Sequence, residues 1–302
     1  MQIEPNKFYS LKNWEYHYGI GKDWLSKSAL SEIILPPSGD GSPRQFRYNR
    51  DHPEELDIFD KEAEKFNRGT AFHTHFLEPD NFKDEIVPIE TFSGTGSRAA
   101  RNEWKDEIKA SGKTPITPEY IEAMKEFEKL LHSGEHDIAR NIIYNDDNFT
   151  EKSGFWIDKE TEMKFKMRAD IMSPYGVIWD LKTHASIKRF MNQAISLHYD
   201  LQAALALEGA TKITDHKHGR FGFVVFHLYK KKPFDIEVVE ASKDFLRSGL
   251  KKLKYVKSLY QHCTESGKWP GKFKDEVKLL DIPEFRRMQM QMEKGEEDYF
   301  GF

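Results

Sequence analysis

The feature that most constrains the fold is a pair of neighbouring segments with a two-residue hydrophobic period. Residues 163–172 alternate apolar and polar side chains, as expected for a strand with one polar face. Residues 173–176, Ser-Pro-Tyr-Gly, have the composition of a turn, and residues 177–183 predict a second strand. We therefore expect an antiparallel hairpin, around which the rest of the chain must fold.

Three charged side chains of this hairpin are candidates for binding a metal or for catalysis. Asp170 on the first strand and Asp180 on the second can meet near one end, and Lys182 shares the face of Asp180 two residues further on. Two carboxylates about 4 Å apart repel by roughly 4 kcal/mol at an effective dielectric of about 20, so we expect a cation between them. Oxygen ligands with an open coordination position suit Mg²⁺ or Mn²⁺.

A metal at this position would suit the hydrolysis of a phosphodiester. It would lower the pKa of a bound water molecule and neutralise the charge that develops on the phosphate. The ammonium of Lys182 would orient that water or stabilise the pentavalent phosphate. The alternative is an ordinary hairpin whose charges face solvent, because the spacing D-x(9)-D-x-K is common by chance.

The remaining pattern predicts helices before and after the hairpin and two further strands. The predicted helices cover residues 69–78, 118–131, 187–208 and 243–262, and the predicted strands cover residues 221–229 and 234–240. Thr117 is a good N-cap before Pro118, which takes the first helical position. Residues 93–112 are polar and contain Gly94 and Gly96, so we expect this stretch to be flexible. The order of elements predicts a mixed α/β domain.

Composition limits the cellular setting more than the function. No stretch reaches the roughly 18 apolar residues of a membrane-spanning helix, and no secretory signal is visible, so we expect a cytoplasmic protein. The single cysteine, Cys263, excludes an internal disulfide and a multi-cysteine zinc site. The formal net charge of −4 argues mildly against a protein that coats DNA, but local basic patches can still bind it. Such patches occur at Lys164, Lys166 and Arg168, at Lys188 and Arg189, and at residues 230–232.

Four separated segments carry motifs of one known family. Residues 25–30 contain S-K-S-x-L, and residues 68–82 contain G-T-A-F-H…L-E-P…F. Residues 151–156 form an acidic-led strand, and residues 168–190 form a hairpin and helix. In these segments the chain resembles the RecE-like exonucleases, the family of the exodeoxyribonuclease VIII nuclease domain. The resemblance covers most of residues 14–270. It implies a PD-(D/E)xK nuclease core of the RecB-like group, with a mixed central sheet flanked by helices.

The resemblance implies a role for each matched residue at the centre of the site. His73 is expected to ligate the metal through a ring nitrogen, whereas a single helical histidine taken alone is more often structural. Asp170 and Asp180 are implied as the metal-binding carboxylates, helped by the backbone carbonyl of Leu181. Lys182 is implied as the catalytic lysine.

Two further positions match the family less completely. Glu151 matches an acidic position that binds or positions a second metal, and a surface glutamate is the alternative. Gln202 matches a helix glutamine that often belongs to a Q-x(3)-Y motif near the DNA. Position 206 is Ala206 rather than tyrosine, so the chain departs from that motif, and Tyr199 one turn earlier is a candidate replacement.

Basic and hydroxyl side chains are candidates for contacts with DNA. Lys188 and Arg189 lie in the matched helix that follows the hairpin. The candidates for gripping a terminal phosphate are Ser26, Lys27, Arg44 and Arg47. For these four residues the alternative is an ordinary solvent-facing position in a loop.

The resemblance also implies the reaction. We expect a Mg²⁺-dependent exodeoxyribonuclease, with Mn²⁺ as a substitute, that digests linear double-stranded DNA from its ends. It would remove one strand 5′ to 3′ and leave a 3′ single-stranded tail for a RecT-like annealing protein. Family members form rings, which implies a homo-oligomer such as a tetramer, in a bacterial cell and of phage or prophage origin. Two alternatives stay open: a structure- or site-specific endonuclease of the same superfamily, and a non-catalytic DNA-binding protein that retains the fold.

The predicted organisation has three parts. Residues 1–68 are expected to form an irregular and helical segment packed on the core. Residues 69–275 are expected to form the nuclease core, with the Asp170 and Lys182 strands at its centre and helices on both faces. Residues 276–302 are expected to form a polar tail whose last residues are mobile.

Overall fold

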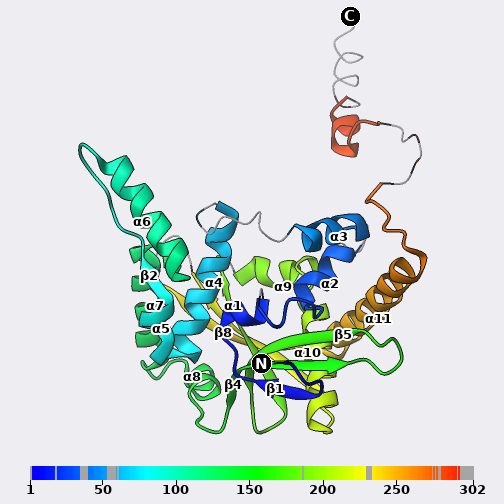
Figure 1. Cartoon of the computed structure of the whole chain (residues 1–302), viewed down its shortest axis with the longest axis horizontal. Coiled ribbons are helices and arrows are strands. Elements are labelled where there is room, and N and C mark those ends of the chain that lie inside the picture. Colours follow the sequence, from blue (N-terminus) through cyan, green and yellow to red (C-terminus); the bar gives the residue numbers. More distant parts are fainter. Residues whose placement is uncertain are drawn as a thin grey trace, which may run out of the picture.

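The structure is a computed structural model of the chain, shown in Figure 1. It describes residues 2–17, 19–34, 40–52, 59, 61–185, 187–228, 233–273, 275, 277, 280–290 and 292, without the side chains of residues 61, 62 and 187–189. The predicted basic run at residues 230–232 and the predicted mobile end at residues 294–302 lie outside these residues.

A six-stranded mixed sheet forms the centre of the fold, in the order β1-β4-β5-β6-β7-β8. Its strands are β1 (Lys7–Tyr9), β4 (Phe149–Ile157), β5 (Lys164–Met172), β6 (Val177–His184), β7 (Arg220–His227) and β8 (Asp235–Glu240). Strands β6 and β7 run parallel, and every other neighbouring pair runs antiparallel. The predicted hairpin is β5–β6, and it lies at the centre of the sheet as expected.

Helices cover both faces of the sheet, each face over its own apolar core (Figure 1). One face carries α2 (Lys27–Ile33), α3 (Pro43–Asp51), α9 (Ile187–Ser196), α10 (Tyr199–Thr214) and α11 (Lys243–Ser266). The opposite face carries α4 (Lys61–Leu77), α7 (Pro118–Leu131) and α8 (Asp137–Ile143). Strand β7 explains the split, because Phe223 and Val225 enter the first core while Val224 and Phe226 enter the second. The predicted α/β fold with a flanked mixed sheet is confirmed.

Smaller elements complete the fold. They are α1 (Asn13–His17), the 3₁₀ helix η2 (Pro79–Asn81), α5 (Phe82–Glu85), α6 (Ser97–Ser111), and the strands β2 (Ile86–Pro88) and β3 (Thr114–Ile116). Strands β2 and β3 pair in parallel as a separate two-stranded sheet. Tyr16 of α1 packs with Leu11, Trp24 and Phe155 in a third, smaller core.

The N-terminal part of the chain contributes directly to the main sheet. Strand β1 pairs with β4, and Lys166 of β5 donates from Nζ to the carbonyl oxygens of Tyr16 and Gly21 over 2.6 and 3.0 Å. The division into parts at residues 68 and 275 stays a prediction. Among the described helices, none is at once long enough and apolar enough to cross a membrane.

Three details of the helices differ from the sequence prediction. The single helix expected at residues 187–208 is two helices, α9 and α10, because His198 adopts a left-handed φ of 57° between them. The apolar pattern continues through this break, so the period alone cannot reveal it. Helix α4 begins at Lys61, ahead of the predicted residue 69. Thr117 takes the N-cap position of α7 as predicted, but its side chain makes no capping hydrogen bond.

The polar stretch at residues 93–112, predicted to be flexible, contains the 15-residue helix α6. The helix begins after Gly96 and ends at Gly112, and both glycines have a positive φ. It buries two apolar side chains, Trp104 and Ile108. The prediction of a flexible stretch was therefore wrong. The sequence pattern did not reveal the helix, because two apolar residues are too few to produce a visible helical period.

Candidate active site

The hairpin β5–β6 opens where its carboxylates lie. Backbone pairing joins residues 171–172 to residues 178–179, next to the turn. Beyond those pairs the N–H of Leu181 donates to the Asp170 carboxylate over 2.7 Å. The Asp170 side chain therefore occupies the place where the backbone of β5 would otherwise bond to β6.

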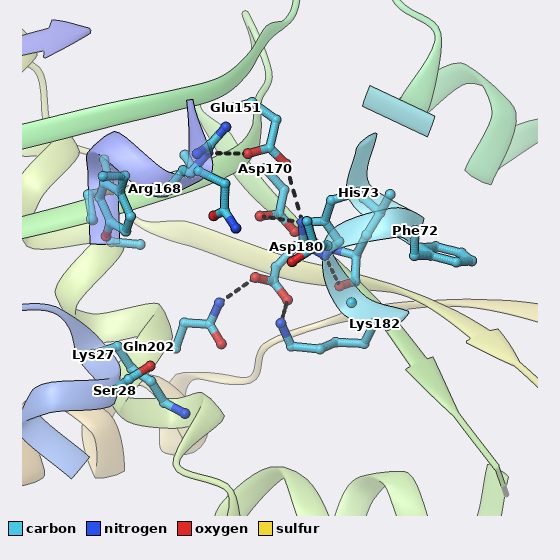
Figure 2. A pocket seen from close by; sticks show the side chains of 18 of the residues that line it. Lys27, Ser28, Phe72, His73, Glu151, Arg168, Asp170, Asp180, Lys182 and Gln202 are labelled. Atoms are coloured by element: carbon cyan, nitrogen blue, oxygen red, sulfur yellow. Dashed lines mark hydrogen bonds and ion pairs between the residues drawn. The ribbon is translucent and has the colours of Figure 1, made fainter. Parts of the chain in front are cut away.

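His73 reaches this opening from α4 (Figure 2). Its Nδ1 lies 3.2 Å from Glu151 Oε1 and 3.5 Å from Asp170 Oδ1, and its Nε2 lies 3.1 Å from the carbonyl oxygen of Leu181. Both ring nitrogens thus face acceptors, and a doubly protonated ring satisfies both by donating from each. Burial alone would lower the pKa of His73, but the negative charges of Asp170 and Glu151 outweigh it and raise the pKa to about 9.

Glu151 comes from β4 in an unusual backbone conformation. Its φ of 50° lies in the left-handed region, which non-glycine residues adopt at a cost on the order of 1–3 kcal/mol, often at functional sites. The buried carboxylate contacts His73 on one side and the Arg168 guanidinium on the other (Figure 2). Burial would raise the pKa of Glu151, but His73 and Arg168 lower it overall, so this group remains a carboxylate.

His73, Glu151 and Asp170 form a group that could hold a metal ion. One ligand atom from each lies within 4.8 Å of the others, and the Leu181 carbonyl borders His73. Burial and the neighbouring Asp180 raise the pKa of Asp170 to about 7, which is the signature of negative charge that a cation would relieve. Carboxylate and carbonyl oxygens with one imidazole suit a divalent ion such as Mg²⁺ or Mn²⁺. The residues present therefore fit the divalent metal expected from the sequence.

Asp180 and Lys182 lie on the side of the opening toward α10 (Figure 2). The Lys182 ammonium forms an ion pair with one oxygen of Asp180, and the amide of Gln202 donates to the other. Lys182 Nζ also lies 5.0 Å from the centre of the Tyr199 ring. Burial would lower the pKa of Lys182, but Asp180 raises it above its ordinary value, so the side chain is a cation at neutral pH. Asp180 thus contacts Lys182 and Gln202 rather than joining the group around His73.

A cleft of about 470 Å³ opens over these residues. All five residues predicted as catalytic line it, together with Gln202, Ser26 and Lys27 from the predicted DNA contacts. Lys27 Nζ donates to the carbonyl of Leu197 over 2.8 Å, and burial lowers the pKa of Lys27 to about 8. Ser26 is the N-cap of α2, where its Oγ accepts from the N–H of Ala29.

The other predicted phosphate contacts lie elsewhere. Arg44 and Arg47 belong to α3 and do not line the cleft as far as the described residues define it. Arg47 instead forms an ion pair with Asp51 over 3.0 Å. Lys188 and Arg189 lie on α9, but their side chains are outside the described part of the chain.

Two charged residues of the cleft, Arg168 and Glu78, were not predicted as site residues, and Arg168 was predicted only as part of a basic patch for DNA. Arg168 binds Glu151 and, through a second nitrogen at 3.3 Å, Glu78. Arg168 precedes Asp170 by two positions on the same polar strand face, and Glu78 follows the helix of His73. Strand parity and the Leu-Glu-Pro match were therefore the available signals for these two residues.

These features define a class of protein. A mixed sheet with a splayed central hairpin, two buried aspartates and a lysine two residues beyond the second are the fold and side chains of a PD-(D/E)xK nuclease. A family model described as a PDDEXK-like domain of unknown function (DUF3799) matches residues 47–276, and the chain belongs to this family. No curated protein sequence matches the chain.

Comparison with solved structures agrees on the fold. The chain is similar to a candidate exonuclease from Eubacterium rectale, at 14% identity and a TM-score of 0.56, over 93% of this chain and 98% of that one. The protein SSO0001 is also 14% identical, over 69% of this chain and 88% of its own, at a TM-score of 0.26. The family match and the shared fold confirm the predicted PD-(D/E)xK membership and are consistent with the RecE-like resemblance.

Proposed function

We propose that the chain is a Mg²⁺-dependent exodeoxyribonuclease that degrades linear double-stranded DNA, with Mn²⁺ as a substitute. One observation carries the proposal: His73, Glu151 and Asp170 converge in a cleft that also contains the Lys182 ammonium. Hydrolysis of a phosphodiester is accelerated by a cation that neutralises the phosphate and by a fixed positive charge beside the attacking water. The cleft offers groups for both tasks.

We assign the ion to His73, Asp170, Asp180 and the carbonyl of Leu181, which requires the Asp180 carboxylate to turn from Lys182 and Gln202 toward the ion. When bound, the ion supplies Lewis-acid chemistry and lowers the pKa of a water molecule. Glu151 is assigned to binding or orienting a second ion, which is supported by its contact with His73 and its strained backbone.

Lys182 contributes a positive charge that persists at neutral pH, because Asp180 raises its pKa. Its Nζ lies between the Asp180 carboxylate and the face of the Tyr199 ring, which restricts its position. From there the ammonium would orient the attacking water or stabilise the phosphate. Gln202 donates to Asp180 and so limits rotation of that carboxylate.

The proposed direction of digestion is 5′ to 3′, leaving a 3′ single-stranded tail. Lys27 and Ser26 on the cleft wall support capture of a terminal phosphate, because a phosphate dianion makes charge-assisted hydrogen bonds that a hydroxyl cannot. A RecT-like annealing protein as the user of the tail and a ring-forming homo-oligomer, in a bacterial cytoplasm and of phage or prophage origin, complete the proposal. These last parts rest on the RecE-like resemblance.

An end-labelled linear duplex and a closed circle of the same sequence distinguish the two kinds of nuclease. We expect loss of the linear duplex in Mg²⁺, an intact circle, and no cleavage of either in EDTA. Cutting of the closed circle would replace the exonuclease with an endonuclease of the same superfamily.

Linear duplexes that differ only in their 5′ ends test the direction. We expect faster digestion from a 5′-phosphate than from a 5′-hydroxyl end, because the dianion is the better ligand for Lys27. Digestion that starts at 3′ ends, or that ignores the end chemistry, would contradict the proposed direction.

A further inference from the structure

Helix α6 carries a row of positive charge outside the cleft. Its four basic side chains, Arg98, Arg101, Lys105 and Lys109, follow one another at intervals of three, four and four residues. At about 100° per residue, this spacing confines them to a band roughly 80° wide along one side of the helix. We call these four residues the basic strip.

Neighbours within the basic strip have the same charge. Arg98 and Arg101, Arg101 and Lys105, and Lys105 and Lys109 are each three or four residues apart, the spacing at which helical side chains meet. Like charges at this spacing destabilise a helix, whereas alternating charges stabilise it. The arrangement is therefore unfavourable for α6 alone.

The same helix contains acidic residues that could have relieved this repulsion. They are Glu103, Asp106 and Glu107, and they lie on the remaining surface of the helix. Among all charged pairs of α6 at helical spacing, Asp106 with Lys109 alone joins opposite signs. Segregation of charge in this way is typical of a helix that presents one side to a charged partner.

Several arginines elsewhere on the surface have acidic partners, although the exposed residues Arg44 and Arg286 have no ion pair within the described part of the chain. Four of them bind an acidic residue three or four positions away on the same helix: Arg47, Arg68, Arg140 and Arg247. Arg98 and Arg101 are exposed, and within the described residues neither has an ion pair. Their charges are thus available to a ligand.

The basic strip lies near the start of α4, the helix that lines one side of the cleft. Trp104 packs edge-on against Phe59, with ring centroids 5.7 Å apart, and Lys105 Nζ lies 5.0 Å from the centre of the same ring. Phe59 lies two residues before α4, and Lys65, the fifth residue of α4 and about 6 Å along its axis, lines the cleft with Phe66. The Phe66 side chain is 74% exposed, so this wall of the cleft is open to a large ligand. Figure 1 shows α6 projecting from the body of the molecule.

We propose that the basic strip binds the phosphate backbone of the duplex whose end lies in the cleft. The inference rests on the proposed nuclease function and names the part of the DNA that α6 contacts. From Arg98 to Lys109 the helix rises by about 16 Å, which corresponds to about five phosphates of one strand at roughly 3.4 Å each. Contacts from lysine and arginine to phosphate are independent of sequence, as digestion of any linear DNA requires.

The test compares two variants of α6 with opposite changes of charge. The strip variant is Arg98→Gln with Arg101→Gln and Lys105→Gln, and the matched control is Glu103→Gln with Asp106→Asn and Glu107→Gln. Binding of a labelled duplex of about 30 base pairs is measured by fluorescence anisotropy in EDTA, from about 50 to 200 mM salt. Thermal melting checks the fold, and Arg98→Gln and Arg101→Gln are also measured singly.

We expect the strip variant to bind at least about tenfold more weakly than wild type at about 50 mM salt. The slope of log affinity against log salt should fall by about 2 to 3, since each lost phosphate contact removes about 0.9. The control should bind as tightly as wild type or more tightly. Affinity and salt slope unchanged in the strip variant would overturn the inference.

Digestion of a linear duplex by the wild type, measured alongside in Mg²⁺, separates the two claims. A wild type that digests the duplex, with a strip variant that binds it normally, overturns the role of α6 and leaves the proposed function intact. A wild type that neither binds nor digests duplex DNA overturns the proposed function itself.

Discussion

Arg168 forms ion pairs with two acidic residues of the cleft. Its guanidinium, on a side chain that is 12% exposed, binds the buried Glu151 and the partly exposed Glu78, and Glu151 in turn contacts His73. Removing one partner of a buried ion pair costs about 3–5 kcal/mol, because the remaining charge stays buried and unpaired. We expect Arg168→Gln to lower the free energy of unfolding by about 3 kcal/mol, measured by urea unfolding.

A second substitution shows whether that loss comes from the unpaired carboxylate. Adding Glu151→Gln to Arg168→Gln removes the orphaned charge, so the double variant should be more stable than Arg168→Gln alone. If the stability losses of Arg168→Gln and of Glu151→Gln, each measured singly, simply add in the double variant, Arg168 and Glu151 do not form the pair described here.

Metal affinity should depend on pH through two residues of the site. The pKa of His73 is raised to about 9 and that of Asp170 to about 7, so both bind a proton more tightly than usual when no metal is present. A metal binds the neutral ring and the ionised carboxylate, and it must displace those protons. The dissociation constant for Mg²⁺ should therefore fall as the pH rises from about 6 to about 9.

Calorimetry in buffers of different ionisation enthalpy counts the protons released. Near pH 7.5 we expect close to one proton per ion, mainly from His73, because Asp170 is already largely ionised there. Release of no proton, with an affinity independent of pH, would remove His73 from the set of ligands.

The sequence predicted some residues of the site better than others. The positions of Asp170, Asp180 and Lys182 followed from the alternation of two strands, because parity places side chains on a face without knowledge of the rest of the fold. The contact of His73 with Glu151 spans 78 residues, and only the family resemblance indicated it. The left-handed backbone of Glu151 has no sequence signal, since surrounding contacts impose it.

Among the helices, Gly249 sets the approach of α11 to α10. A Cβ at this position would lie 1.9 Å from the carbonyl oxygen of Asp200, a backbone atom that cannot rotate away. Alanine is otherwise better than glycine in a helix by about 1 kcal/mol, but overpacking costs about 1–3 kcal/mol and occasionally more. We expect Gly249→Ala to lower the melting temperature and the free energy of unfolding, by about 1–2 kcal/mol net.

Gly69 in α4 is the matched control. A Cβ there meets no atom within 4 Å, so Gly69→Ala should show the helical preference alone and raise the free energy of unfolding by up to about 1 kcal/mol. Thermal melts of both variants are compared with wild type. Changes of the same sign in the two variants would contradict the described contact of α10 with α11.

Helix boundaries were predicted less well than strands. The strands of the hairpin were found because their alternating pattern is long and continuous. Helix α6 was missed because its face toward the body contains two apolar residues, and the break at His198 was missed because a single left-handed residue leaves the apolar pattern unchanged. Both misses are local events that tertiary packing decides.

In the whole molecule, three distant segments meet at the opened hairpin. Helix α4 brings His73 from one face of the sheet, α10 brings Gln202 from the other, and β4 supplies Glu151 from the next strand. The cleft lies over this meeting point, and the basic strip of α6 lies near the start of α4. The sheet thus places the acidic groups at its centre, where a phosphodiester bound in the cleft would meet them.

The central claim is that this cleft hydrolyses DNA with a divalent metal. Asp170→Asn tests it most directly, because the amide oxygen can still accept from the N–H of Leu181 while the metal-binding charge is lost. Cleavage of a linear duplex in Mg²⁺ is measured for wild type, Asp170→Asn and Lys182→Met, with thermal melts to verify that each protein is folded. We expect the rate to fall by about 10³-fold or more for both variants, and no wild-type cleavage in EDTA. Near-normal cleavage by folded Asp170→Asn protein, or wild-type cleavage in EDTA, would contradict the account.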